Sequence, residues 1–127
     1  MRQAVWVAVV SMAAILLLSW YADGARRNIG FELIERRHAM LEQVKHNDME
    51  KAMESVMDAE KWWREKEETL ALFTHHELTD AVGDWLTQIL LAIEADREYE
   101  LYAGLEGLEN AARRLHEQDA FLLKNIL

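Results

Sequence analysis

The amino-acid sequence predicts an all-α protein: an N-terminal transmembrane helix followed by an antiparallel bundle of about four helices, arranged as two helical hairpins. Three observations lead to this prediction. The 127 residues include no proline, so nothing in the chain forces a helix to break. Strong helix formers dominate, and β-branched residues become sparse after residue 15. Apolar residues then recur every three or four positions, which is the spacing of one helix face.

The predicted membrane anchor occupies residues 1–24, and the predicted helical-bundle domain occupies residues 25–127. The 18 residues from Ala4 to Tyr21 carry no charge. As a helix they extend about 27 Å, close to the thickness of a hydrocarbon core. Aromatic residues near both ends of the run are typical of membrane interfaces. The residues assigned to the anchor are Ala4, Trp6, Leu16, Leu17, Leu18, Trp20 and Tyr21.

A cleaved secretory signal is the alternative interpretation of this segment. The apolar run is longer than a usual signal core, Arg2 alone precedes it as a basic residue, and no clean small-x-small site follows before Asp23. We therefore favour an uncleaved, single-pass anchor in the cell membrane. Its orientation stays open on the residues alone. Four arginines in residues 26–37 favour a cytoplasmic domain by the positive-inside rule, whereas a short stub before a signal-like core favours the opposite side.

Charge and cysteine content exclude several kinds of function. Residues 1–22 contain one Arg and no acidic residue, so the remainder holds 13 Lys and Arg against 23 Asp and Glu, a net charge of −10. A domain this acidic repels phosphate backbones, so we expect no nucleic-acid partner. The chain has no cysteine, which excludes disulfides, thiolate metal sites and cysteine nucleophiles.

The domain divides into amphipathic segments joined by short polar links. A polar turn at 46–48, with Asn47 as the predicted N-cap, separates the first two segments, and Asp96 is the predicted cap before the last. The predicted face of the first segment comprises Phe31, Ile34, His38, Leu41 and Val44. The second stripe comprises Met49, Ala52, Val56, Ala59, Trp63, Leu70 and Phe73. The third comprises Leu78, Val82, Trp85, Ile89 and Ile93, and the fourth Leu101, Leu105, Leu108, Ala112 and Leu115.

Two further features refine this architecture. Gly104 and Gly107 are costly inside a helix, by about 1 kcal/mol each against Ala, and predict that another helix packs close to them. An offset of 49 residues places Asn47 on Asp96 and Val56 on Leu105. Each half of the domain therefore has the order helix, cap, helix.

The segment "LFTHHEL" at 72–78 raises the question of a metal or acid–base site. Thr74 and Glu77 have the spacing of a capping box at the start of a helix, and Phe73 and Leu78 fit a hydrophobic staple. The alternative is a metal- or ligand-binding site, or an enzyme, that uses His75, His76, Glu77 and Asp80. Two ligands four residues apart indicate a metal only weakly, and no H-E-x-x-H motif is present. We expect no catalytic residue, no metal, no cofactor and no enzymatic activity.

Candidate partner contacts lie elsewhere. Trp62 falls off the apolar stripe, so we expect it at a contact surface, whereas Trp63 and Trp85 are assigned to the core. The apolar C-terminal tail adds Phe121, Leu122, Leu123 and Ile126. These residues predict a protein-interaction or accessory module whose partners are the bilayer and either another membrane protein or a second copy of the chain.

Several segments together resemble a known bacterial family. They are "NDMEKA" at 47–52, Trp63, "LFTHHEL" at 72–78 and "FLLKNIL" at 121–127. Their order and spacing resemble the domain of unknown function 4363 family, short proteins with an N-terminal membrane helix and a helical domain. Members usually have Asp-Trp where this chain has Asp48-Met49, and commonly Ile-Asp-His where it has "THH" at 74–76. The resemblance implies this architecture and an extracytoplasmic domain, and it implies no catalytic residue.

Overall fold

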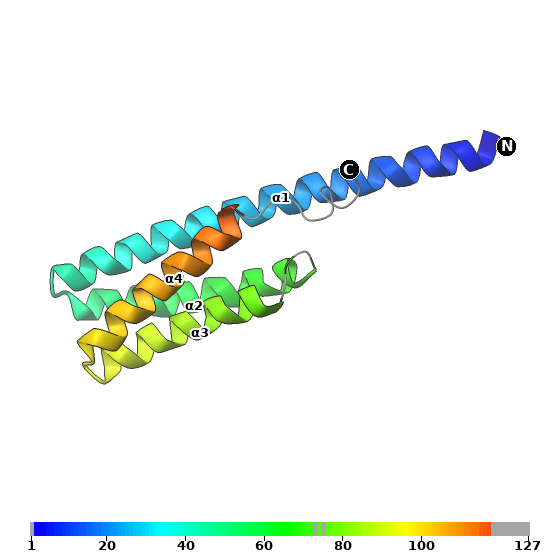
Figure 1. The fold of residues 1–127 in the computed structure, drawn as a ribbon. Helices are drawn as coiled ribbons and strands as arrows, with labels where there is room; N and C mark the ends of the chain where they lie inside the picture. Colours follow the sequence, from blue (N-terminus) through cyan, green and yellow to red (C-terminus); the bar gives the residue numbers. More distant parts are fainter. Residues whose placement is uncertain (1, 73, 75, 118–127) are drawn as a thin grey trace.

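The structure is a computed structural model that describes residues 2–72, 74 and 76–117. The described chain forms four α-helices: α1 (Arg2–Lys45), α2 (Met49–Ala71), α3 (His76–Glu94) and α4 (Glu98–Glu117). The C-terminal half of α1 lies in a bundle with the other three helices, and among the described residues its N-terminal half projects beyond them (Figure 1). The predicted all-α fold, with a long apolar first helix and a helical bundle, is confirmed.

α1 passes without a break through the predicted domain boundary at Gly24. Asp23 forms ion pairs with Arg26 and, at 3.2 Å, with Arg27, across one helical turn. Pairs at these spacings stabilise a helix locally. The apolar segment and the first helix of the bundle are therefore one continuous helix.

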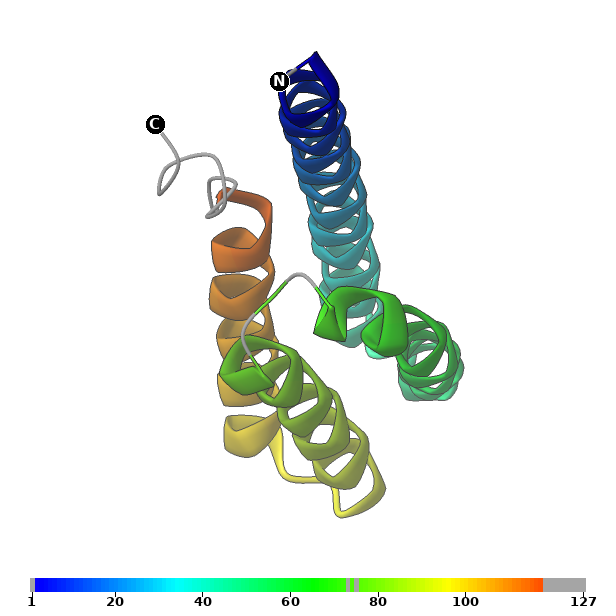
Figure 2. The ribbon, with the colours of Figure 1, turned by 90° about the vertical axis from the view of Figure 1, so that its right-hand side faces the viewer.

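The bundle is a closed ring of helices around one core. Helices contact in the pairs α1–α2, α2–α3, α3–α4 and α1–α4. Seen from the end in Figure 2, the four helices surround a common centre. The predicted stripe of α4 is confirmed, because all five of its residues are buried. The other large, fully buried side chains of the core include Leu33, Met40, Val56, Leu70, Val82, Leu86 and Ile89.

The predicted face of α1 is confirmed in part, and the buried face is rotated from it by about one position. Of the predicted residues, Val44 is buried and Ile34 and Leu41 are partly buried against the core, so this part of the face is confirmed. Phe31 and His38 are exposed instead, and Leu33 and Met40 are buried in the core. One residue turns a helix by about 100°, so the two stripes compete for the same core. The buried face of α1 is aliphatic in its centre. His38 remains exposed to water, so its ring nitrogens are not desolvated.

In both hairpin turns the residue predicted to cap the next helix instead ends the preceding helix. Asn47 and Asp96 have φ values of 58° and 54°, which place them in the left-handed region that ends a helix. The Asp48 amide donates to the Gln43 carbonyl (2.9 Å), and the Arg97 amide donates to the Ala92 carbonyl (2.9 Å). The N-cap of α2 is Asp48, whose carboxylate accepts from the Lys51 amide at 3.2 Å. The 49-residue offset therefore joins positions with the same structural role.

The prediction that a neighbour packs close to Gly104 and Gly107 is confirmed. A Cβ at Gly104 would lie 2.8 Å from Cγ1 of Ile89, and a Cβ at Gly107 would overlap the indole ring of Trp85. Trp85 is half-buried and packs against the core, in line with its predicted role. These two glycines let α4 approach α3 at a distance that a larger residue prevents.

Gly107→Ala is expected to destabilise the bundle although alanine favours helix. The helix gains up to about 1 kcal/mol from the lost glycine, but the displaced indole ring costs about 1–3 kcal/mol of packing. In a Trp85→Leu background the ring is gone, so the same substitution should be neutral or stabilising. Thermal unfolding of the four proteins of this double-mutant cycle measures the coupling. Equal effects of Gly107→Ala in both backgrounds would contradict the close packing.

α1 and α4 meet through an unusually close and polar contact. A Cβ at Gly30 would lie 2.8 Å from the backbone nitrogen of His116, and the His116 Nδ1 lies 3.2 Å from the Arg27 carbonyl. Two turns along α1, Arg37 Nε donates to the Leu105 carbonyl (3.1 Å), and its guanidinium pairs with Glu109 at 3.2 Å. The end of α4 is thus held against α1 close to where the apolar half begins.

Candidate functional site

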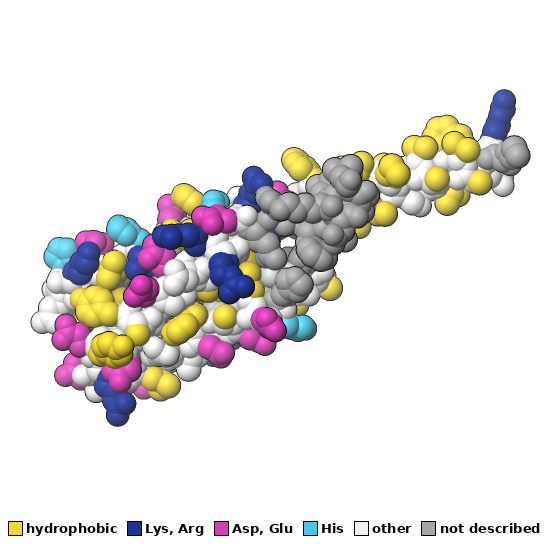
Figure 3. Space-filling model, viewed as in Figure 1, with side chains coloured by type: hydrophobic (Ala, Val, Ile, Leu, Met, Phe, Trp, Pro, Cys, Tyr) yellow, Lys and Arg dark blue, Asp and Glu magenta, His cyan; other side chains and the backbone are white. Residues whose placement is uncertain are grey.

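The N-terminal half of α1 presents apolar side chains on its surface. All seven residues that the sequence assigns to the anchor are exposed. Figure 3 shows hydrophobic side chains distributed over this projecting helix, with a basic residue near its tip. We call residues 4–21 the apolar half of α1. Among the described helices, α1 is long and apolar enough to cross a membrane, although a signal sequence or a buried core helix can have the same length and composition.

The histidine-containing link is a helix boundary, as predicted. α2 ends at Ala71 and α3 begins at His76. The predicted capping box is wrong, because the buried Thr74 hydroxyl has no hydrogen-bond partner in the described structure. The Thr74 amide instead donates to the Leu70 carbonyl at 2.8 Å, which ties this residue to the end of α2 rather than to the start of α3. Phe73 and the predicted staple lie outside the described residues.

The candidate metal ligands in this link are exposed where they are described. His76, Glu77 and Asp80 lie in the first turns of α3 and face solvent, and His75 falls in a part that the structure does not describe. Over the described ranges, no group of three or more His, Asp or Glu residues gathers where it could hold a metal ion. His76 and Asp80 thus supply two donors on one helix, fewer than the three protein ligands of a catalytic zinc site.

Trp62 is not the surface contact that its position off the stripe predicts. The side chain is only 9% exposed and belongs to the core. The guanidinium carbon of Arg36 lies 4.8 Å from the Trp62 ring centroid, a cation–π contact between α1 and α2. Trp63 is buried, as predicted, on the side of α3, where its indole nitrogen would lie 3.8 Å from a Cβ at Gly83. α2 packs between α1 and α3, so the adjacent Trp62 and Trp63 are both buried, Trp62 on the side of α1 and Trp63 on the side of α3.

The end of the bundle away from the apolar half carries an aromatic surface around a hollow. The two hairpin turns meet there and enclose about 310 Å³. Tyr102 lines the hollow and is 38% exposed, while Tyr99, one turn earlier on the same face of α4, is 83% exposed. The hollow is also lined by Met49, by the basic residues Lys45 and Arg97, and by the acidic residues Asp96 and Glu98. We call Tyr99, Tyr102, Lys45, Met49 and Arg97 the distal surface.

Comparison with known proteins assigns the chain to a family. A protein-family model described as "Domain of unknown function (DUF4363)" matches residues 28–126. The chain belongs to this family. The predicted membership is thereby confirmed, and the matched region begins after the apolar half of α1. No curated protein and no solved structure matches the chain.

Several described residues that carry the resemblance contribute to the turns and the core of the DUF4363 fold. Asn47 adopts the left-handed turn, Asp48 caps α2, and Ala52 and Trp63 are buried. The "LFTHHEL" segment contains the break between α2 and α3. The tail residues Phe121, Leu122, Leu123 and Ile126, predicted as partner contacts, lie outside the described residues.

Sequence reasoning missed the distal surface of the DUF4363 bundle. Its residues come from both hairpins, and Lys45 and Tyr102 are far apart in the chain. A partial signal was present, because Tyr99 and Tyr102 are three residues apart on the face of α4 opposite the Leu101–Leu108 stripe. Large aromatic side chains on a polar helix face are candidates for recognition.

Proposed function

We propose that this DUF4363 protein is a single-pass membrane protein whose helical domain is a non-enzymatic interaction or accessory module for another membrane protein or a second copy of the chain. One observation carries the proposal: an exposed, charge-free helix of membrane-spanning length continues without a break into a bundle with its own core. Leaving this mostly apolar run of 18 uncharged residues in water is unfavourable by about 25 cal/mol for each Å² of apolar surface. A bilayer removes that cost.

The distal surface is the proposed contact for the partner. Exposed tyrosines next to a hollow supply apolar area together with a hydroxyl, and tyrosine and arginine are enriched in protein interfaces. The distal surface lies about 36 Å from the end of the apolar half, because 24 residues of α1 separate Tyr21 from Lys45. It would therefore meet a partner well clear of the bilayer. The acidic domain argues against nucleic acid as that partner.

We place the domain on the extracytoplasmic side. The family resemblance implies this side of the membrane. The basic residues that follow the apolar half of α1 do not argue strongly against export, since domains of more than about 60 residues are translocated largely regardless of charge. Arg26 and Arg27 pair with Asp23, Arg36 pairs with Glu32, and Arg37 pairs with Glu109.

A single cysteine at Tyr99 tests partner and sidedness together, because the natural chain has no cysteine. In intact cells, the Tyr99→Cys protein is expected to react with a membrane-impermeant maleimide. When it carries a photoactivatable maleimide, it should form a discrete cross-linked species, either a dimer or an adduct of one defined mass. Met57→Cys, exposed on α2, is the matched control and should label equally but form no such species. Labelling only after lysis would overturn the sidedness, and equal cross-linking at both positions would overturn the distal contact.

A further inference from the structure

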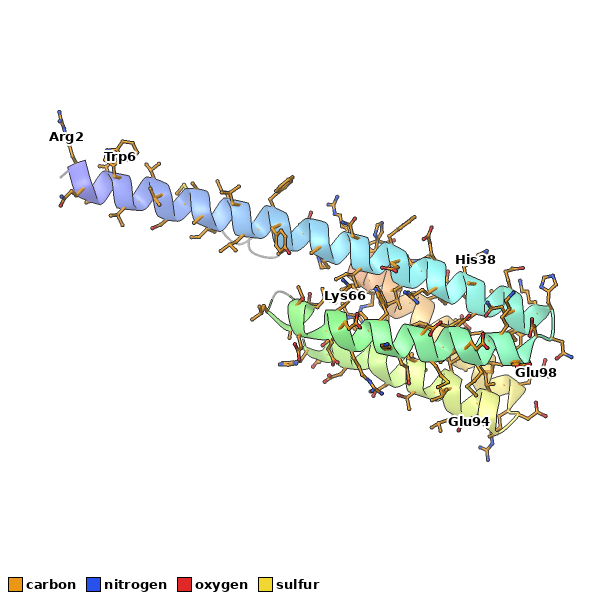
Figure 4. All side chains as sticks on the ribbon, turned by 180° about the vertical axis from the view of Figure 1, so that it is seen from behind. Arg2, Trp6, His38, Lys66, Glu94 and Glu98 are labelled. Atoms are coloured by element: carbon orange, nitrogen blue, oxygen red, sulfur yellow. The ribbon has the colours of Figure 1, made fainter. Side chains whose placement is uncertain are left out.

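The C-terminal end of α2, at Ala71 and Leu72, lies level with the end of the apolar half of α1. α2 runs back along α1 from the turn at 46–48, and its 23 residues extend about 34 Å. The same length measured back from Lys45 along α1 ends near Ala22. In Figure 4, Lys66 of α2 lies toward the projecting half of α1, whereas Glu94 and Glu98 mark the opposite end of the bundle. The end of α2 therefore comes to the height at which α1 would enter a bilayer.

The two ends of the bundle differ in composition in a way that matches this placement. The distal turns read "KHNDME" at 45–50 and "EADRE" at 94–98, with a charged residue at most positions. The near end reads "TLALFT" at 69–74, with no charge between Glu68 and His75. Turns that face solvent usually consist of polar residues, so an uncharged, largely apolar segment is unusual at such a position.

Leu72 is a large apolar side chain that is exposed at this near end. It is 79% exposed, although Leu70, two residues earlier, is buried in the core. At the same height on α1, Trp20 and Tyr21 are also exposed, and such aromatics lie at the level of lipid headgroups. Neighbouring packed helices are about 8–10 Å apart, so the end of α2 would lie over the lipids directly beside α1.

We propose that the C-terminal end of α2 is a second membrane contact, in which Leu72 enters the interfacial region of the bilayer next to α1. The proposal rests on the membrane insertion of α1 proposed above. The contact is shallow, because the exposed carboxylates of Glu68, Glu77 and Asp80 flank Leu72 in the sequence and stay in water. Those acidic residues also make a zwitterionic lipid surface the fitting partner rather than an anionic one.

A second contact would fix the orientation of the bundle relative to the bilayer. A single helix in a bilayer leaves the bundle free to rotate about the helix axis and to tilt. A second contact, displaced sideways from α1, restricts both motions. The distal surface, at the other end of the bundle, is then presented to its partner in one direction, which reduces the entropy lost on binding.

Three single-cysteine variants of the full-length protein, each labelled with an environment-sensitive fluorophore in phosphatidylcholine nanodiscs, test this contact. Leu72→Cys, Tyr99→Cys and Leu17→Cys are all at exposed positions, so none should disturb the fold. The label at 72 is expected to show blue-shifted emission, quenching by lipids brominated near the headgroup end of the acyl chain, and little quenching by aqueous iodide. The label at 99 should show the reverse.

The label at 17 separates the two proposals. If it is quenched by lipid while the label at 72 behaves like that at 99, the second contact is wrong and the anchor stands. If the label at 17 is itself quenched by iodide and not by lipid, the insertion of α1 fails and the second contact fails with it. A lipid-quenched label at both 17 and 72, with an iodide-quenched label at 99, supports the second contact.

Discussion

Replacing Met12 and Leu16 together by aspartate is expected to move the protein from the membrane fraction to the soluble fraction. Both side chains are exposed near the middle of the apolar half of α1. An aspartate near the centre of a membrane helix costs about 2.5–3.5 kcal/mol, so two cost roughly 5–7 kcal/mol. Since 1.4 kcal/mol is a factor of about ten, insertion should weaken by about 10⁴-fold or more. Aspartate is chosen because its short side chain cannot reach the interface as lysine and arginine do.

Alkaline carbonate extraction followed by immunoblotting measures this change. The matched control replaces Met57 and Tyr99 by aspartate, since these side chains are exposed on the bundle. The control adds the same charge without altering the apolar half and should stay with the membrane. Retention of the Met12→Asp/Leu16→Asp protein in the carbonate-washed pellet would contradict insertion. A natural protein recovered soluble and shortened at its N-terminus would identify the segment as a cleaved signal.

The parts of the fold that follow from local pattern were predictable. In α4, every apolar stripe residue from Leu101 to Leu115 is buried, because this stripe has no rival on the same helix. In α1 two stripes lie about one residue apart, and the sequence alone does not say which one α2 and α4 cover. The burial of Trp62 has the same origin: a helix that contacts two neighbours buries an arc wider than a single stripe.

The roles of the turn residues and the location of the candidate site could not be predicted from the sequence. Asn47 and Asp96 are good N-caps and also tolerate a left-handed backbone, so their residue type fits either role, and the hydrogen bonds of the preceding helix decide between them. The distal surface could not be predicted, because its hollow exists only where the two hairpin turns meet. The exposure of Leu72 is also a tertiary property, since Leu70 has the same chemistry and is buried.

Replacing Gly30 by alanine is expected to lower the stability of the bundle by about 1–3 kcal/mol, although alanine favours helix by up to about 1 kcal/mol. The added Cβ would lie 2.8 Å from the backbone nitrogen of His116 and 2.9 Å from its Cα. A side chain could rotate away from such an overlap, but backbone atoms within a helix cannot. α1 and α4 must therefore move apart along this contact, which weakens neighbouring packing.

Gly24→Ala is the matched control on the same helix. Nothing lies within 4 Å of the position of its Cβ, so the substitution should be neutral or stabilise the helix. Thermal unfolding of the full-length protein in nanodiscs, followed by circular dichroism, compares the two variants. At about 4–8 °C for each kcal/mol in a domain of this size, Gly30→Ala should lower Tm by several degrees. Equal Tm values for the two variants would contradict the close approach of α1 and α4.

Where amide protection is lost in Gly30→Ala distinguishes a local clash from general destabilisation. His116 also contacts Arg27 through its ring nitrogen and faces Phe31, with ring centroids 6.4 Å apart. Separating the helices at Gly30 removes both contacts, so amide exchange in the last turns of α4 should accelerate more than exchange at the distal turns. The same separation would loosen α4 from the one helix that continues into the apolar half. Gly30 is thus a position where a single methyl group is expected to uncouple the end of the bundle from its anchor.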